Sequence, residues 1–410
     1  MLDLIESFLR ENNYDIRISG NARWCDQKCT PDVISFVADC VINYSLFDNN
    51  VCFSARDIWD FEYASETIRE IFRKPNTQSP LTRNEYDKFF SQPLELLAYS
   101  RILTKNQIGN RNFYTINKRS FLEYISVRER NSLDFLCLYF NKVLSDSGLW
   151  NDFELFFNHQ NQDSYFELKT KFEDFTIEYT RINNRTEVRR IFSKILNPIA
   201  FKFRKRGTNR GRISKHDISF AELMYNRNNF RDIWSEKPKD VTRREWIRDI
   251  KNKINPDYYR YQSLKSKKFL KEYNNEYRSA KSELIDEFSS GNATQIHHIF
   301  PESKYPSISG FLENMMALTP TQHLFKAHPN NNTNNIDREY QQLILETKAL
   351  IIEENVGSEN QIYTYENFSI VLNTGFEHED FVTIDNYEVA MNIIQNYYSQ
   401  EIYYENISDL

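Results

Sequence analysis

Apolar and polar positions in the first 130 residues predict a series of helices. Residues 33–42 form an almost unbroken apolar run, which predicts a buried helix. Ser54 followed by Asp57 is typical of a helix N-terminus, with a hydroxyl cap and an acid in the first turn. That helix is expected to continue to about residue 73. Residues 83–100 carry apolar side chains at helical spacing, with Pro93 as a break or a new start.

A hairpin is expected after these helices. Short apolar runs at 102–103 and 113–116 flank a polar tip that contains Arg111. Helices followed by a hairpin with a basic tip resemble a winged helix-turn-helix, which would read DNA. The alternative is an ordinary helical domain with one hairpin.

The middle of the chain combines apolar helices with basic segments. Residues 131–149 predict a core helix, and 150–200 predict aromatic-rich helices. Two glycines and several cations in 202–212 predict a mobile basic loop, for which phosphate contacts are favoured over plain solvation. Residues 236–280 are basic with interleaved aromatics and are expected to be helical. The cations expected to contact DNA in these two segments are Arg204, Lys205, Arg206, Arg210, Arg212, Arg243, Arg244, Lys267 and Lys268.

The last 60 residues are acidic and aromatic. Residues 362–365 and 368–372 are rich in β-branched and aromatic side chains and are separated by two residues, which allows a short hairpin. A terminal helix is expected over 391–398. This tail is expected to face away from DNA or to contact the basic part of the chain.

The distribution of charge along the chain favours a nucleic-acid partner, although the total does not. The net charge is −6, but residues after 350 hold 12 acids and no Lys or Arg, so residues 1–350 carry +6. Residues 202–278 hold 22 basic and 10 acidic side chains, a net of +12. Glycine is scarce, at 9 residues, and no Gly-rich phosphate loop is present in the sequence.

Composition also bears on location. No run approaches 18 consecutive apolar residues, and acids follow Met1 where a signal peptide needs basic residues, so no membrane span and a cytoplasmic protein are expected. Five cysteines form an odd set within the first third, which fits a reducing compartment. Cys25 and Cys29 have the spacing of half a zinc site. Buried packing is the favoured interpretation, because no second Cys/His pair is near.

Candidate chemistry is concentrated late in the chain. Four of the seven histidines lie within residues 297–328, as the pair His297-His298 and as His323 and His328, with Asn314 between them. Hydrolysis of a phosphodiester needs a base for the attacking water and a cation that stabilises the phosphate oxygens. Adjacent strand residues point to opposite faces, so a His-His pair on a strand can present one ring to a metal and the other to the water.

This pattern resembles the HNH, or ββα-metal, nucleases, and its His-His opening is similar to that of the colicin-type DNases. The resemblance covers about a tenth of the chain. It implies that His297 and His323 bind a divalent metal, that His298 is the general base, and that Asn314 braces the loop holding His298. His328 lies one residue later than the third histidine of the colicin pattern, so its role as a ligand stays open. Lys326 fits a basic position that could contact phosphate. The zinc-binding CxxC pairs of many members are absent from the sequence here.

Together these features predict an α+β, mostly helical protein. We expect a helical, winged-helix-like DNA-recognition region over 1–130, a helical region with a basic loop over 131–235, an HNH nuclease domain over 236–350 and an acidic extension over 351–410. The expected activity is site-specific cleavage of double-stranded DNA, as in HNH-type type II restriction endonucleases of phage defence, and it stays open whether this chain is of the type IIS kind, which cuts at a distance from its recognition site. Hydrolysis would use one Mg²⁺, or Mn²⁺ or another divalent ion, and leave 5′-phosphate and 3′-hydroxyl ends.

The expected partners are double-stranded DNA, a second copy of the chain for double-strand cleavage, and a cognate DNA methyltransferase. Two other functions stay open from sequence. One is a nonspecific DNase effector of anti-phage defence, and the other is a DNA-binding regulator with an inactive nuclease fold.

Overall fold

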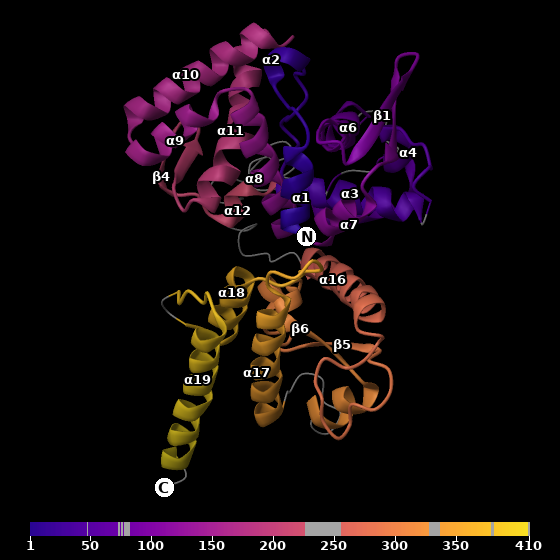
Figure 1. Ribbon diagram of the computed structural model, residues 1–410, viewed down its shortest axis with the longest axis vertical. Coiled ribbons are helices and arrows are strands. Elements are labelled where there is room, and N and C mark those ends of the chain that lie inside the picture. Colours follow the sequence, from indigo (N-terminus) through magenta and orange to yellow (C-terminus); the bar gives the residue numbers. More distant parts are fainter. Residues whose placement is uncertain are drawn as a thin grey trace, which may run out of the picture. The chain divides into compact units, whose positions relative to one another are not determined.

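The computed structural model describes residues 1–46, 48–72, 74, 77, 83–225, 256–327, 337–378 and 381–408. The chain divides into two compact units, an N-terminal unit over Leu2–Lys253 and a C-terminal unit over Ile254–Leu410, to which Met1 is assigned. Helices dominate the described residues, which also hold three separate two-stranded antiparallel sheets (Figure 1). The predicted α+β, mostly helical class is confirmed at this level. The finer division into four parts stays a prediction.

The N-terminal unit is built largely of helices around α3. This helix is buried along almost its whole length and packs on α6, α7 and α8, as the apolar run at 33–42 predicted. The helices are α1 (Leu2–Arg10), α2 (Ile16–Ser19), α3 (Pro31–Ser45), α4 (Ala55–Asp60), α5 (Glu62–Phe72), α6 (Arg83–Tyr99), α7 (Arg119–Val127), α8 (Glu129–Asp146), α9 (Trp150–His159), α10 (Gln162–Tyr179), α11 (Arg185–Lys202) and α12 (Phe220–Leu223).

The predicted helix start at Ser54 is correct, but its expected length is wrong. Ser54 and Asp57 form a reciprocal capping box at the start of α4. The helix then ends at Phe61, whose backbone is extended, and α5 begins at Glu62. Pro93, in contrast, lies inside α6 and does not end it.

The first hairpin agrees with the expectation. Strand β1 (Leu103–Ile108) pairs with β2 (Arg111–Ile116) from Leu103 opposite Ile116 to Ile108 opposite Arg111. The turn is two residues long, and Gly109 at φ +60° supplies the positive φ that such turns require at their first position. The likeness to a winged helix stays a prediction.

The expectation of a mobile basic loop over residues 202–212 is wrong. Arg206–Asn209 and Arg212–Asp217 form strands β3 and β4, joined by Arg210 and Gly211, which both have positive φ. The side chain of Asn197 in α11 accepts from the backbone N–H of Thr208 (2.7 Å) and donates to its carbonyl (3.0 Å). The hairpin is therefore seated on α11, and the absence of apolar alternation in its sequence concealed it.

The C-terminal unit packs helices around one short sheet. Its elements are α16 (Pro256–Tyr277), β5 (Gln295–His298), the 3₁₀ helices η2 (Pro306–Ile308) and η3 (Leu312–Asn314), β6 (Met315–Leu318), the π-helical turn η4 (Gln322–Ala327), α17 (Arg338–Asn355), α18 (Tyr365–Gly375) and α19 (Tyr387–Ser408). All four residues of β6 are buried, and Met315, Met316 and Leu318 share one core with α17, α18 and α19.

A hairpin over residues 362–372 was expected and is not formed. Tyr365–Gly375 is helix α18, capped by Thr364, whose hydroxyl accepts from the backbone N–H of Asn367. Phe368, Val371 and Leu372 share its buried face, which is helical spacing. The terminal helix α19 is present and extends beyond the predicted 391–398 on both sides.

Membrane-spanning helices and the state of the cysteines are the two features about which composition made a prediction. Within the described residues, no helix is both long enough and apolar enough to cross a bilayer. Cys25 and Cys29 are buried, as the packing interpretation predicted, and all five cysteines are free thiols.

Candidate metal and catalytic site

The His-His pair lies on a short antiparallel sheet followed by a helical turn. In the ladder between β5 and β6, His297 is opposite Met316 and His298 is opposite Met315. A 16-residue connection with the two 3₁₀ helices joins these strands, and η4 follows β6 after a short turn. The two histidines end β5, so they lie next to the connecting loop.

His297 and His323 face each other. Their ring centroids are 5.3 Å apart with the ring planes at 77°, and His297 is 2% exposed. Two imidazoles bound to one ion through nitrogens at about 2.1 Å, with a tetrahedral angle between them, have centroids roughly 5 Å apart. The donor chemistry and the separation of this pair therefore fit two ligands of one divalent ion.

Gln322 holds the turn that carries His323. Its side-chain nitrogen donates to the Leu284 carbonyl (2.9 Å) and to the Asp286 carboxylate (2.8 Å). Its side-chain oxygen accepts from the Thr319 N–H (3.0 Å) and the Ser282 hydroxyl (2.7 Å). Because both ends of this buried amide are occupied, the backbone next to His323 is fixed. Sequence reasoning did not identify Gln322.

His298 projects to the other side of the strand, toward α16 and the connecting loop. Its Nε2 lies 2.9 Å from the carbonyl oxygen of Ser309. A carbonyl only accepts, so Nε2 carries the proton and Nδ1 keeps a lone pair in the neutral ring. Burial and, to a smaller extent, the charge of Lys267 outweigh the opposing effect of the Ser309 carbonyl and lower the pKa of His298 to about 4. The ring is therefore neutral at pH 7.

Glu302 and Ser263 complete the surroundings of His298. A carboxylate oxygen of Glu302 lies 3.9 Å from Nδ1 of His298. The Ser263 hydroxyl donates to that same oxygen (2.9 Å) and lies 3.4 Å from Nε2. Sequence reasoning missed both residues. Glu302 carries a faint signal, an acid four residues after the histidine, whereas Ser263 in α16 carries none.

Lys267 lies one helical turn after Ser263 in α16. Burial lowers its pKa, while the nearby charge of Glu302 raises it. Lys267 is therefore a partly buried cation close to His298, and its charge acts on that histidine. Its neighbour Lys268 is exposed.

Asn314 fixes the connecting loop. It is fully buried, its side-chain oxygen accepts from the Phe300 N–H (2.8 Å), and its nitrogen donates to the carbonyls of Phe300 (3.1 Å) and Ile308 (3.2 Å). Ile308 directly precedes Ser309, the residue that orients His298. Asn314 therefore holds the loop backbone next to Ser309, and the role that the family resemblance implies for it, bracing the loop at His298, stays a prediction.

A buried ionic cluster supports β6 from behind. The Glu283 carboxylate accepts from Lys348 (3.0 Å), from Arg278 (2.7 Å) and from the backbone N–H of Ala317 (2.6 Å). Burial would raise the pKa of Glu283, but the charges of Lys348 and Arg278 outweigh it and the pKa lies below its ordinary value. This cluster ties α17 to the strand opposite the His-His pair.

The remaining predicted DNA contacts are dispersed. Lys326 is exposed, 3.6 Å from the Glu287 carboxylate and 4.8 Å from the Phe288 ring centroid. Arg111 is exposed at the turn of the first hairpin. Arg204, Arg206, Arg210 and Arg212 are exposed on or beside the β3–β4 hairpin, and Lys205 is half-buried. His328, Arg243 and Arg244 lie outside the described residues.

The described part of the C-terminal unit thus holds two metal-ligand candidates rather than a complete set. Where the structure describes the chain, no group of three or more His, Cys, Asp or Glu side chains is arranged to hold a metal ion. Comparison with protein-family models, with curated proteins and with solved structures gives no match to this chain.

Proposed function

We propose that this chain is a metal-dependent DNA endonuclease of the HNH type. One observation carries the proposal. His297 and His323 face each other on one side of β5, while a neutral His298 lies on the other side with its proton fixed on Nε2. This arrangement supports a division in which His297 binds the metal and His298 takes the proton, because phosphodiester hydrolysis needs both a cation and a base.

His298 suits the role of general base. Its Nδ1 is available to take a proton from the attacking water, because the Ser309 carbonyl engages Nε2. The imidazolium formed in that step would lie 3.9 Å from the Glu302 carboxylate, which stabilises the positive charge. Lys267 supplies a nearby cation for a phosphate oxygen.

His297 and His323 would hold the divalent ion, with His328 as a third candidate. When bound, the ion would supply a positive charge for the phosphate oxygens and the leaving 3′-oxygen. Mg²⁺ stays the predicted physiological ion, with Mn²⁺ or another divalent ion as the alternative. Imidazole nitrogen favours transition-metal ions over Mg²⁺, so a series of divalent ions is the informative assay.

The proposed substrate is double-stranded DNA cut at specific sites, as by a type II restriction enzyme. The basic excess of residues 202–278 favours a polyanion, and the N-terminal unit is large enough to hold a sequence reader. Homodimeric action, 5′-phosphate and 3′-hydroxyl ends and a partner methyltransferase belong to this proposal. A nonspecific effector DNase would degrade a plasmid to a smear, and an inactive regulator would bind without cutting.

The test is a plasmid-cleavage assay with His298→Ala. We expect the variant to retain DNA binding and to lose cutting by a factor of about 10²–10⁴, the contribution typical of a general base. His378→Ala, which removes a histidine of the same unit from outside the site, is the matched control and should cut normally. Wild-type cutting by His298→Ala would contradict the assignment. Sequencing the ends from a digested phage genome then reports specificity and overhang.

A further inference from the structure

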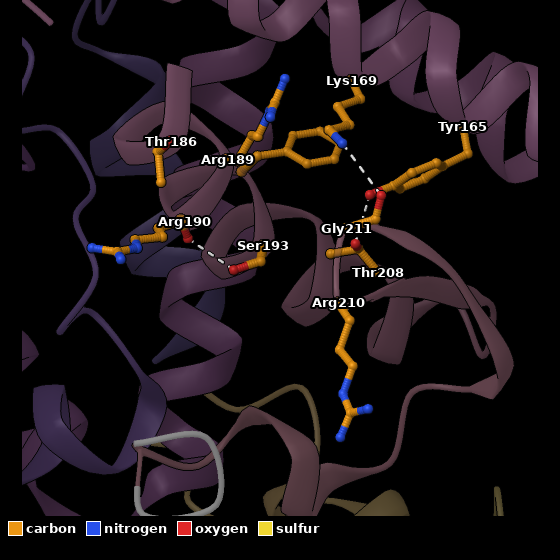
Figure 2. Close-up of a pocket in the computed structure, with 10 residues that line it drawn as sticks. Tyr165, Lys169, Thr186, Arg189, Arg190, Ser193, Thr208, Arg210 and Gly211 are labelled. Carbon is orange, nitrogen blue, oxygen red and sulfur yellow. Dashed lines mark hydrogen bonds between the residues drawn. The ribbon is translucent and has the colours of Figure 1, made fainter. Parts of the chain in front are cut away.

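A cationic pocket lies within the N-terminal unit, where α10, α11 and the β3–β4 hairpin meet (Figure 2). Its volume is about 270 Å³. Tyr165 comes from α10, Thr186 and Ser193 come from α11, and Thr208 comes from the hairpin. All of these elements belong to the same compact unit, so the pocket is a feature of one folded body.

The pocket is rigidly built on its hairpin side. The Tyr165 and Thr208 hydroxyls are 2.7 Å apart, and Lys169 donates to the Gly211 carbonyl (3.2 Å). A Cβ atom at Gly207 would lie 2.5 Å from the Asn197 side-chain oxygen, so only glycine allows this close approach. The hairpin is therefore locked to α10 and α11, and the pocket is preformed.

The charge of the lining is one-sided. Four of its ten residues are cations, Lys169, Arg189, Arg190 and Arg210, and none is a carboxylate. The Arg189 side chain is already paired with a buried carboxylate outside the lining, Glu173, which accepts from Arg189 (2.7 Å) and from Arg185 (3.0 Å). Neither Arg190 nor Arg210 forms an ion pair with any residue that the structure describes. The lining therefore carries unbalanced positive charge and hydroxyl groups, which is the chemistry that binds phosphate.

The directions in which the cationic side chains point favour an extended polyanion over a small anion as the ligand. In Figure 2 the Arg190 and Arg210 side chains extend away from the pocket in different directions, while Lys169 points inward at Gly211. A small anion such as inorganic phosphate would need these groups to converge on one point. A chain of phosphates passing over the pocket can meet each of them in turn.

We propose that this pocket seats one phosphate of a DNA strand, with Lys169 and the hydroxyls beneath it and with Arg190 and Arg210 on the flanking phosphates. DNA as the polyanion rests on the proposed function, whereas the site itself rests on the geometry of the N-terminal unit. Lys169, Arg190, Thr186 and Ser193 thereby join the DNA contact surface. The sequence concealed them, because α10 and α11 carry mixed charge and their residues meet the hairpin only in the folded unit.

The test measures DNA binding, separately from cutting, in full-length protein that carries His298→Ala. Fluorescence anisotropy with a labelled 20-base-pair duplex is recorded over a range of salt concentrations. Removing two phosphate contacts with Arg190→Ala and Arg210→Ala should reduce the slope of log K against log salt by about 1.8 and weaken binding about 30-fold at 0.15 M salt. Arg56→Ala with Arg10→Ala, two exposed arginines of the same unit, is the charge-matched control and should change the slope little.

A second variant tests the pocket without removing any cation. Thr186→Glu places a carboxylate in the first turn of α11, where the helix N-terminus stabilises it, so the fold should persist. We expect binding to weaken at least tenfold with an unchanged melting temperature. Wild-type affinity in both variants would overturn the proposal, as would binding of single-stranded RNA or inorganic phosphate through the same residues in place of duplex DNA.

The two proposals can fail separately. If pocket variants bind weakly while the parent chain never cuts DNA with any divalent ion, the pocket stands and the nuclease proposal falls. If the chain cuts DNA and the pocket variants bind and cut like the parent, the nuclease stands and the pocket assignment falls.

Discussion

At the scale of single residues, Asn314 links the buried loop to the candidate base. Asn314→Ala would remove the side-chain partner of the Phe300 N–H and of the Phe300 carbonyl, while the Ile308 carbonyl would keep the Phe311 N–H as a donor. We expect the unfolding free energy to fall by about 2–4 kcal/mol, since each buried polar group left unsatisfied costs about 1–3 kcal/mol. DNA cutting should fall at least tenfold, because Ser309 would no longer hold the His298 ring in place.

Urea unfolding without added metal measures the stability change separately from catalysis. Asn292→Ala, at an exposed asparagine of the same unit, is the control and should alter neither property. If Asn314→Ala were as stable as the parent, the loop would be held by other contacts and the bracing role would be wrong.

Asp32 provides a pH-dependent prediction in the N-terminal unit. Burial raises its pKa from 3.8 to about 6, and the charge of Glu129 contributes, although Thr30 and the Tyr225 N–H donate to it. A raised carboxyl pKa means that the folded state prefers the protonated form. The stability from this group is therefore full below about pH 4 and is lost as pH rises through 6.

Asp32→Asn removes this titration. Any constant loss from altered hydrogen bonds cancels when two pH values are compared. The unfolding free energy of the variant minus that of the parent should therefore be about 2 kcal/mol larger at pH 7.5 than at pH 4.5. Urea unfolding at both pH values measures it. If this difference in unfolding free energy is the same at both pH values, folding does not raise the pKa of Asp32.

The residues of the candidate site differ in how far the sequence reveals them. His297, Asn314 and His323 were predicted because their spacing along the chain is itself the signal. Ser263 lies 35 residues before His298, and Gln322 acts on Leu284, 38 residues earlier. No local pattern records such contacts, because they depend on how α16 and the segment after it pack on the sheet.

At the scale of elements, Gly207 tests whether the β3–β4 hairpin is locked in place. Gly207→Ala would bring a Cβ to 2.5 Å from Asn197 Oδ1 and 2.8 Å from Ile218 Cγ1. Overpacking of this kind costs about 1–3 kcal/mol, and displacement of the hairpin should also weaken DNA binding. Gly109→Ala is the matched control, because its added Cβ meets nothing within 4 Å and only the backbone strain at φ +60° remains.

If urea unfolding shows the same loss of unfolding free energy for both glycine variants, the structure around Asn197 accommodates the added Cβ atom of Gly207→Ala without a packing cost. A larger effect of Gly207→Ala, together with weaker DNA binding, is the expected result.

The same scale shows why one predicted hairpin formed and another did not. The β1–β2 hairpin has a two-residue turn with glycine where a positive φ is needed, and this signal is local. The segment 362–372 has strand-like composition, but Asn355 accepts from the backbone N–H groups of Ile362 (2.8 Å) and Tyr363 (3.0 Å). Thr364 then caps a helix, so tertiary contacts outweighed the strand propensity.

At the scale of the whole molecule, the histidine motif and the cationic pocket belong to different compact units. His297, His298, Asn314 and His323 all belong to the C-terminal unit, which has its own hydrophobic core. The pocket and both hairpins with exposed arginines belong to the N-terminal unit. If the proposed function is correct, chemistry and recognition are properties of different folded bodies.

This division predicts how a fragment would behave. Residues 254–410 contain the whole described site and a core of about two dozen buried apolar residues, so the fragment should fold and bind a divalent ion by itself. It lacks the pocket and part of the basic excess of residues 202–278, so it should nick plasmid DNA slowly and without sequence preference. The full chain should produce discrete fragments from the same plasmid. Gel analysis and end sequencing distinguish the outcomes: discrete fragments from the isolated unit would place recognition there, and a smear from the full chain would favour a nonspecific DNase.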